Sequence, residues 1–331
     1  MTETKRLWVL GGKSLQIDAI EDLLHERGED STYATAVGQR VNAVTAYIAD
    51  SPKLIETISA APYTHVYFVE CFDISAGVFA KKRDIKTGLI GSIYRGQLGF
   101  GKTPAEFMAG STIGQVITIL AQEDKLSRWI SCGIGNRAGT FALQSGKWAV
   151  SSRLNHYIPE EFVLLAASEY LDAAYRGECP GVDSETLKEW RVHSLAKFEG
   201  RTGEQVLADI KSARTLVQRT RERSQLPLSI ADLRDGYCRD CGSEGMPTGG
   251  RQCIVGNKFR HNITPVIPEL FDAAALEGVA CLSIGQDFWM GQREFVLQCA
   301  SPAQIEWFGG EFKAQEEYSA PARGIAGGLI K

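Results

Sequence analysis

The sequence predicts an α/β protein with a mostly parallel sheet, and three patterns support that fold class. The apolar run Leu7–Leu10 is followed by a glycine turn and then by apolar residues at helical spacing up to Leu24. His65–Cys71 has the composition of a second buried strand, after a short helical pattern at Leu54–Ala60. Helical patterning then dominates residues 159–224. Strands that alternate with helices imply a parallel sheet covered on both faces.

The remaining elements of the N-terminal part follow in chain order. Val41–Ile48 (VNAVTAYI) is strand-like and would belong to the same sheet. The long helical segment begins at Pro159, because proline is preorganised for a first helical turn. Cys179–Gly181 breaks that segment, and Asp183 or Ser184 can cap the helix that follows.

The composition changes after Leu226, where a second group of elements is expected. Residues 236–256 are rich in glycine, cysteine and polar residues, so they are predicted to be a loop. After Pro268 the sequence predicts the following elements: a helix at Glu269–Leu276, strands at Val279–Ile284 and Glu294–Cys299, a helix at Pro302–Phe308 and a glycine-rich tail at Ala322–Leu329.

These patterns predict two lobes. Residues 1–225 would carry the parallel sheet with a helical extension at 159–225. Residues 226–331 would form a smaller α/β lobe, with a cysteine-containing insertion at 236–262. A cleft between two lobes is a common position for a ligand, and the ligand is expected there.

Composition restricts the class of protein. The 331 residues are 44% hydrophobic and 23% charged, as in ordinary globular proteins. The net charge of −4, from 36 basic and 40 acidic residues, argues against binding of nucleic acid through a global positive field. No run approaches the ~20 apolar residues of a membrane span. The N-terminus lacks the pattern of a signal peptide, so a cytoplasmic location with no membrane partner is expected.

A phosphate-loop pattern occurs at Gly96–Thr103 (GQLGFGKT), with Lys102 and Thr103 in the positions that contact phosphates and magnesium. Pro104 follows and removes an N–H group close to where a phosphate would lie. Chance matches are common in a chain with 34 glycines. A nucleotide hydrolase that uses this loop is therefore one alternative, and a glycine-rich loop before a helix is the other.

The turn Gly11-Gly12-Lys13-Ser14 is a second candidate for phosphate binding. Its glycines allow close approach of the backbone to a ligand, and Lys13 and the start of the following helix favour an anion. Asp18 lies one helical turn further on and would point towards the mouth of the turn. A tight turn that needs glycine for structural reasons is the alternative.

Acidic residues follow the second predicted strand. Ligands of open α/β sheets gather beyond the carboxyl ends of the strands, where Glu70 and Asp73 are expected. Either carboxylate could hold a metal ion there. The alternative is a helix cap or a solvated loop residue.

The eight cysteines do not form a disulfide framework, and most have apolar neighbours typical of buried thiols. Cys238 and Cys241 form a C-x-x-C pair, with Cys253 and His261 as further soft ligands. Four such ligands could hold a structural zinc ion, with no open position for catalysis. Unligated thiols in a surface insertion are the alternative.

The tail is the last candidate. Arg323, Gly324, Gly327 and Gly328 suit a loop that contacts an anion with backbone N–H groups. A flexible terminal segment is equally consistent with this composition.

In series, these pieces resemble a diverged member of the DHH-type phosphoesterase superfamily. The resemblance rests on LGGKSLQID at residues 10–18, VYFVEC at 66–71, GFGKTPAEF at 99–107, EYLDAAYRGECPGVD at 169–183 and ARGIAGG at 322–328. Together these segments span most of the chain, and each is weak by itself. The resemblance implies a two-lobe fold and, in intact members, two Mn²⁺ or Mg²⁺ ions that activate water.

The departures from the family pattern concern the metal ligands. The Asp-His-His triplet of the family falls on Gly91-Ser92-Ile93, and a later Asp-His pair falls on Glu169-Tyr170. The resemblance therefore implies a protein that binds a nucleotide, a short oligonucleotide or another phosphate-bearing ligand, with weak or lost hydrolysis. Three alternatives remain open: a phosphodiesterase that uses Asp18, Glu70, Asp73 and Glu169, the phosphate-loop hydrolase, and a non-catalytic subunit with a protein partner or self-association.

Overall fold

The structure is a computed structural model that describes residues 4–36, 39–40, 52–91, 97–122, 125–126, 140–151, 156–223, 253–255, 270–278, 280–286, 293–306 and 315–330. The chain divides into two compact units. The first comprises residues 1–102 and 106–166, and the second comprises residues 103–105 and 167–331.

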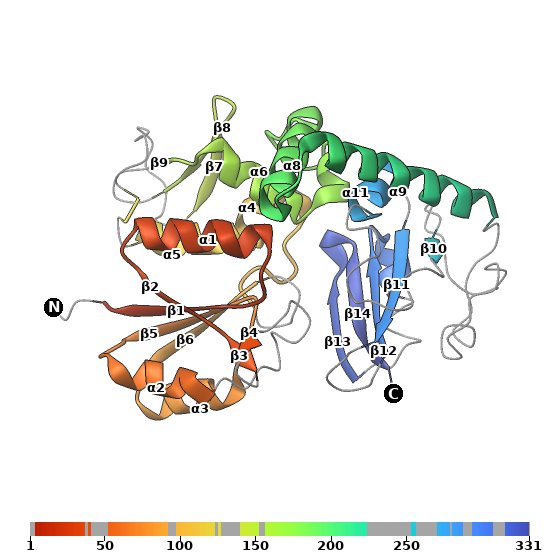
Figure 1. The fold of residues 1–331 in the computed structure, drawn as a ribbon. Coiled ribbons are helices and arrows are strands. Elements are labelled where there is room, and N and C mark those ends of the chain that lie inside the picture. The colour runs from red at the N-terminus through yellow and green to blue at the C-terminus, as the bar shows by residue number, and fades with distance from the viewer. Residues whose placement is uncertain are drawn as a thin grey trace. The chain divides into compact units, whose positions relative to one another are not determined.

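The first unit is built on a four-stranded sheet in which all neighbouring strands run parallel (Figure 1). All five residues of its strand β1 are buried, as expected for a strand covered on both faces. In their order across the sheet the strands are β2 (Asp30–Tyr33), β1 (Arg6–Leu10), β5 (His65–Val69) and β6 (Lys86–Ile90).

Helices lie on both faces of this sheet. Helix α1 (Leu15–Glu26) connects β1 to β2 and lies with α5 (Thr112–Gln122) on one face, whereas α2 (Pro52–Ala60) and α3 (Ile74–Lys82) lie together on the other (Figure 1). The chain moves from β1 to β2 on one side and later to β5 on the other side. Right-handed crossovers in opposite directions place the helices on opposite faces.

The core of the first unit follows the alternation of side chains along the strands. Leu7 and Val9 of β1 pack with Val66 and Phe68 of β5 in the cluster beneath α2 and α3. Trp8, at the alternate position, is completely buried on the opposite face. A strand that buries both of its faces reads as a continuous apolar run, which is why β1 and β5 could be predicted from the sequence.

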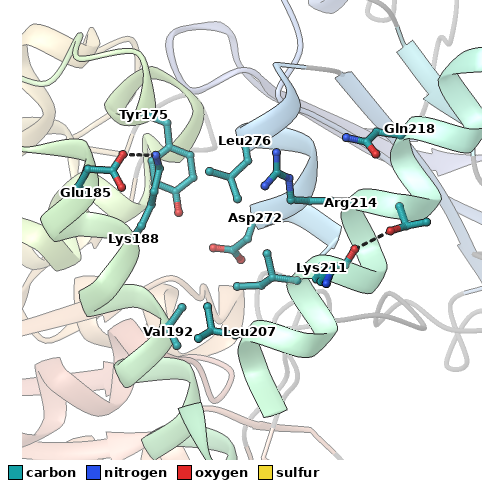
Figure 2. Close-up of a pocket in the computed structure, with 12 residues that line it drawn as sticks. Tyr175, Glu185, Lys188, Val192, Leu207, Lys211, Arg214, Gln218, Asp272 and Leu276 are labelled. Carbon is teal, nitrogen blue, oxygen red and sulfur yellow. Dashed lines mark hydrogen bonds and ion pairs between the residues drawn. The ribbon is translucent and has the colours of Figure 1, made fainter. Parts of the chain in front are cut away.

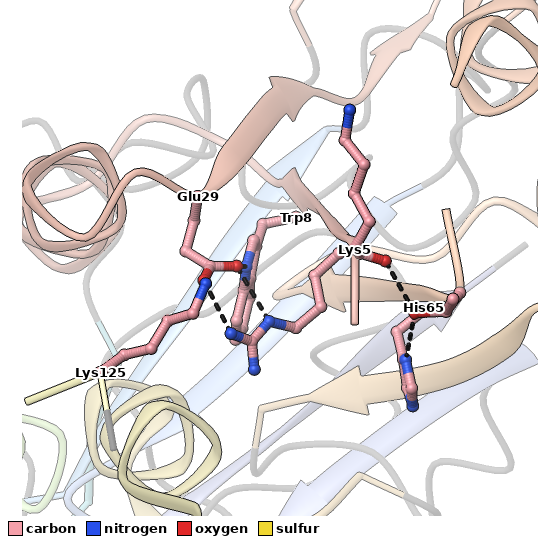
Figure 3. A network of polar contacts seen from close by, with 7 residues as sticks. Lys5, Trp8, Glu29, His65 and Lys125 are labelled. Carbon is pink, nitrogen blue, oxygen red and sulfur yellow. Dashed lines mark hydrogen bonds and ion pairs between the residues drawn. The ribbon is translucent and has the colours of Figure 1, made fainter. Parts of the chain in front are cut away.

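A buried ion-pair network fixes the start of β1 and the segment before β2 (Figure 3). Glu29 accepts hydrogen bonds from Arg6 at 2.7 and 2.9 Å, from the Trp8 indole N–H at 2.8 Å and from Lys125 at 2.6 Å. The side chains of Arg6 and Glu29 are 0% and 2% exposed. The two charges are therefore held away from water and depend on each other.

This network makes the first unit sensitive to acid. Burial by itself raises the pKa of Glu29, but the hydrogen bonds from Arg6, Lys125 and Trp8 outweigh it and hold that pKa below its ordinary value. A lowered pKa in the folded state means that the unfolded chain binds the proton more readily. The stabilisation is therefore complete above the ordinary glutamate pKa of about 4.3 and is lost as the pH falls through the lowered pKa.

We expect the free energy of unfolding to fall below pH 4 more steeply in the wild-type protein than in the Glu29→Gln variant. The measurement is urea unfolding between pH 3 and 7, where Glu56→Gln, an exposed change in α2, serves as the control. Equal pH slopes for wild type and Glu29→Gln would contradict the assignment.

Shorter elements complete the first unit. An antiparallel sheet in the order β7-β8-β9 follows α5, and Trp148 of β8 meets Phe107 edge to face with 5.3 Å between ring centroids. These elements are β3 (Thr35–Ala36), β4 (Gln39–Arg40), the 3-10 turn η2 (Pro104–Glu106, which begins in residues assigned to the second unit), α4 (Phe107–Gly110), β7 (Phe141–Gln144), β8 (Lys147–Val150) and β9 (His156–Tyr157). Helix α6 (Glu160–Ser168) runs across the unit boundary.

The second unit begins with helices. The expected helix start after the break at 179–181 is confirmed, because the Asp183 carboxylate caps α8 by accepting from the Thr186 N–H at 2.8 Å. Gly200 ends α8 in the left-handed conformation. The helices are α7 (Leu171–Tyr175), α8 (Ser184–Glu199), α9 (Gly203–Arg223) and α11 (Leu270–Glu277).

A five-stranded sheet completes the second unit, with only its first pair parallel. The helix and the two strands predicted after Pro268 are confirmed as α11, β11 and β12, and residues 302–306 are helical. In spatial order the strands are β10 (Cys253–Val255), β11 (Ala280–Gln286), β12 (Arg293–Gln298), β14 (Ile325–Ile330) and β13 (Gln315–Ala320), and the turn η4 (Pro321–Arg323) joins the last two.

The α/β fold class is confirmed, with a parallel sheet first and antiparallel sheets later in the chain. The second unit includes residues 167–331, so it contains the helices of 167–223, which the sequence analysis grouped with residues 1–225. The strand expected at Val41–Ile48 lies outside the described residues. Among the helices in the described parts of the chain, none has the length and apolar character needed to cross a bilayer.

Candidate functional site

The carboxyl edge of the parallel sheet has a topological switch point between β1 and β5. The connection after β1 leads to α1 on one face, and the connection after β5 leads to α3 on the other face (Figure 1). The point where two connections diverge in this way is the usual ligand position in open α/β sheets. We refer to the two loops Gly11–Ser14 and Glu70–Asp73 as the switch-point site.

The two loops of the switch-point site touch through their backbones. The Gly11 N–H donates to the Val69 carbonyl at 3.0 Å. A Cβ atom at Gly11 would lie 2.6 Å from the Glu70 carbonyl oxygen, closer than real Cβ contacts allow. Glycine at position 11 is therefore required by the packing of the loops, whatever they bind.

Lys13 and Ser14 directly precede α1. The Ser14 hydroxyl accepts from the Ile17 N–H at 3.2 Å and caps the helix, so this hydroxyl has a structural task. Lys13 is exposed. Asp18 lies in the first turn of α1, as predicted. The 12-residue helix directs its positive end to this edge of the sheet.

The acids after β5 are held by neighbouring groups. Glu70 has the left-handed backbone angle φ 51°, and its carboxylate accepts from the Thr112 hydroxyl at 2.9 Å. Asp73 is 1% exposed and accepts from the Ala76 N–H at 2.9 Å, so it caps α3. Asp73 is therefore a helix cap, which was one of the two alternatives for the acids after β5. Burial raises the pKa of the nearby Cys71 thiol, so Cys71 is not a ready nucleophile.

A buried glutamine organises the end of the neighbouring strand β6. The Gln115 side chain accepts from the Gly91 N–H and donates to the carbonyls of Gly91 and Gly110, each at 3.0 Å. Gln115 is 4% exposed, and Gln97 packs beside Gly91. These contacts give Gly91 a structural role at the end of β6, while Ser92 and Ile93 lie outside the described residues.

The segment with the phosphate-loop pattern does not have phosphate-loop geometry in its described part. The N–H groups of Gly99, Phe100 and Lys102 donate to backbone carbonyls of the loop and its neighbourhood, at 2.9–3.2 Å, and are used within the turn. A 3-10 turn and the four-residue α4 follow, where a phosphate loop continues into a long helix. The Lys102 ammonium pairs with Glu106 at 2.8 Å.

In the second unit, two predicted site residues pair with each other. The Arg323 guanidinium lies 3.2 Å from a carboxylate oxygen of Glu169 and also donates to the Glu169 backbone carbonyl at 2.9 Å. Their side chains are 10% and 3% exposed. Burial makes this pair a structural ion pair, so Arg323 has a carboxylate partner where a phosphate was predicted.

The glycine-rich tail is a strand, which corrects the expectation of a loop. Gly327 and Gly328 lie in β14, which has β12 on one side and β13 on the other, so the strand backbone is engaged in sheet pairing. Gly324 has φ 68° and ends the turn η4. The expected anion contact through this backbone is not supported, because a strand between two others has its N–H groups directed to its neighbours.

The predicted zinc ligands can be placed only in part. Cys253 begins β10, whereas Cys238, Cys241 and His261 lie outside the described residues. Within the described parts of the chain, no group of three or more His, Cys, Asp and Glu side chains could hold a metal ion. The structural zinc site stays a prediction.

Sequence reasoning missed Thr112 and Gln115, which contact the loops after β5 and β6. Their signal was weak, because polar residues in an otherwise apolar helix also occur on solvated faces. What shows their role is that both are buried, at 0% and 4% exposed.

Comparison with protein-family models, with curated proteins and with solved structures finds no match for this chain. The class of the protein is therefore stated from its fold: an α/β protein with a topological switch point in the parallel sheet of its first unit.

Proposed function

We propose that the protein binds a nucleotide or another phosphate-bearing ligand at the switch-point site, with weak or absent hydrolysis of that ligand. The observation that carries the proposal is the close contact of the loops Gly11–Ser14 and Glu70–Asp73 directly before the N-terminus of α1. Backbone N–H groups and a helix N-terminus at a topological switch point suit a phosphate. The resemblance to DHH-type phosphoesterases supports the same ligand class and stays a hypothesis.

The acids at this edge do not favour a two-metal reaction. Asp73 is used as a helix cap and Glu70 is bonded to Thr112, so neither carboxylate is arranged with other ligands around a common cation. The described residues therefore do not fit a centre for Mn²⁺ or Mg²⁺. A cytoplasmic location remains part of the proposal.

The first test is equilibrium binding by calorimetry at low salt, with AMP, ADP, ATP, a dinucleotide, inorganic phosphate and adenosine. We expect the phosphorylated compounds to bind and adenosine to bind more weakly. The Lys13→Gln variant should lose roughly tenfold in affinity, because a charge-assisted contact to phosphate is removed. Lys53→Gln, an exposed change in α2, is the matched control and should bind as wild type.

Product analysis in the presence of Mn²⁺ or Mg²⁺ separates the alternatives. Chelator-sensitive cleavage of dinucleotides would support the phosphodiesterase that uses Asp18, Glu70, Asp73 and Glu169. Triphosphate hydrolysis abolished by Lys102→Ala would support the phosphate-loop hydrolase. If none of these compounds binds, the proposal fails and the interaction subunit remains.

A further inference from the structure

A pocket of about 740 Å³ lies within the second unit (Figure 2). Its volume is in the range of small-molecule sites. Helices α7, α8, α9 and α11 all contribute side chains to its wall. The charges and apolar groups of this wall define the kind of ligand that would fit.

Two carboxylates line the pocket, Glu185 and Asp272, and each of them has a cationic partner. Asp272 on α11 is 1% exposed and accepts hydrogen bonds from two nitrogens of Arg191, one of them at 3.0 Å. Tyr175 also hydrogen-bonds to Asp272, and burial together with this carboxylate raises the pKa of Tyr175 well above its usual value. The tyrosine is therefore neutral, and Asp272 offers little repulsion to an anion.

The cations of the wall differ in whether they have a partner. Lys188 pairs with Glu185 at 2.6 Å, and Arg214 pairs with Glu277 at 2.7 Å. Lys211, on the same helix as Arg214, has no ion pair within the described part of the chain. Among the described residues, the Lys211 ammonium is therefore the charge of the pocket that a ligand could pair with.

The rest of the wall is largely apolar. Four apolar side chains line the pocket: Val192, Leu207, Ile210 and Leu276. Leu207 is 55% exposed and lies one helical turn before Lys211. An exposed leucine beside an available ammonium group suits a ligand with an apolar body and one anionic end.

We propose that this pocket binds a small organic anion with an apolar chain, whose carboxylate contacts Lys211 and whose chain packs on Leu207. The ligand class is a medium-chain acyl or aryl carboxylate. This site is separate from the switch-point site and does not depend on the proposed function.

The test uses octanoate below its micelle-forming concentration, with binding followed by calorimetry or by NMR titration of the full chain. We expect saturable binding that strengthens from hexanoate to decanoate, by about two- to fourfold for each added CH₂ group. Octylammonium, which has the same chain and the opposite charge, should not bind. Lys211→Gln should weaken octanoate binding by about fivefold, since the contact is partly exposed to water.

A control variant outside the pocket and a second variant within it show whether octanoate binds there. Lys197→Gln on α8 lies outside the pocket and should leave the affinity unchanged, whereas Leu207→Ser should lower it about threefold. Both positions are exposed, so these variants are expected to fold. Absence of saturable octanoate binding, equal binding of octylammonium, or an equal loss in Lys197→Gln would each overturn the proposal.

Discussion

Replacement of Glu29 by glutamine is expected to destabilise the first unit by about 3 kcal/mol, because the fully buried Arg6 guanidinium would lose the carboxylate that accepts two of its hydrogen bonds. Proteins are stable by only about 5–15 kcal/mol, so this change is a large part of the total. The measurement is the free energy of urea unfolding at pH 7, followed by tryptophan fluorescence, since Trp8 is itself bonded to Glu29.

A graded pair of variants keeps this prediction testable if Glu29→Gln does not fold. Lys125→Gln removes a partner whose side chain is 35% exposed, so water replaces the contact and the cost should stay below about 1 kcal/mol. Glu56→Gln on α2 should have no measurable effect. A Glu29→Gln variant as stable as Glu56→Gln would show that the network contributes nothing to folding.

The second large effect is expected from Gly114→Ala in the first turn of α5. A Cβ atom at this position would lie 1.6 Å from the Met108 carbonyl oxygen of α4, a backbone atom that cannot turn aside. The same turn is held by Ser111, whose hydroxyl donates to Met108 and accepts from the Gly114 N–H at 3.1 Å. We expect a loss of about 3 kcal/mol or more, in spite of the higher helix propensity of alanine.

Gly77→Ala in α3 is the matched control, because it makes the same chemical change within a helix of the same unit. Its Cβ atom would lie 3.3 Å from the edge of the Phe72 ring, and a side chain can move by a few tenths of an ångström. Its stability should therefore stay within about 1 kcal/mol of wild type. The contact at Gly114 would be refuted by equal effects of the two substitutions on urea unfolding.

Local patterns were enough to predict two of the four strands in the sheet of the first unit, β1 and β5. The apolar runs of β1 and β5, the glycine turn and the start of α1 each depend on residues close together in the chain. Asp183 was identified as a possible helix cap for the same reason, since a cap contacts an N–H group three residues away. The cap formed by Asp73 was one of two local alternatives, and only the position of its carboxylate distinguished them.

Contacts between distant residues were not predictable in this way. Lys125 meets Glu29 across 96 positions, and Arg323 meets Glu169 across 154. Nothing near Arg323 in the sequence signals that its partner is a buried carboxylate, so it was interpreted as a phosphate ligand. The glycines of the tail were interpreted as a loop for a similar reason, because the strands on both sides of β14 lie elsewhere in the chain or across a turn.

The sequence by itself determined that this is an α/β protein that begins with a strand, a glycine turn and a helix, since periodicity and turn chemistry act over a few residues. Only the tertiary structure decided which polar side chains are available to a ligand. Burial and long-range pairing committed Asp73, Glu169 and Arg323 to the fold, and they left Lys211 without an ionic partner in the described part of the chain. Burial and pairing depend on which distant parts of the chain pack together, and the residues next to each side chain in the sequence do not show this.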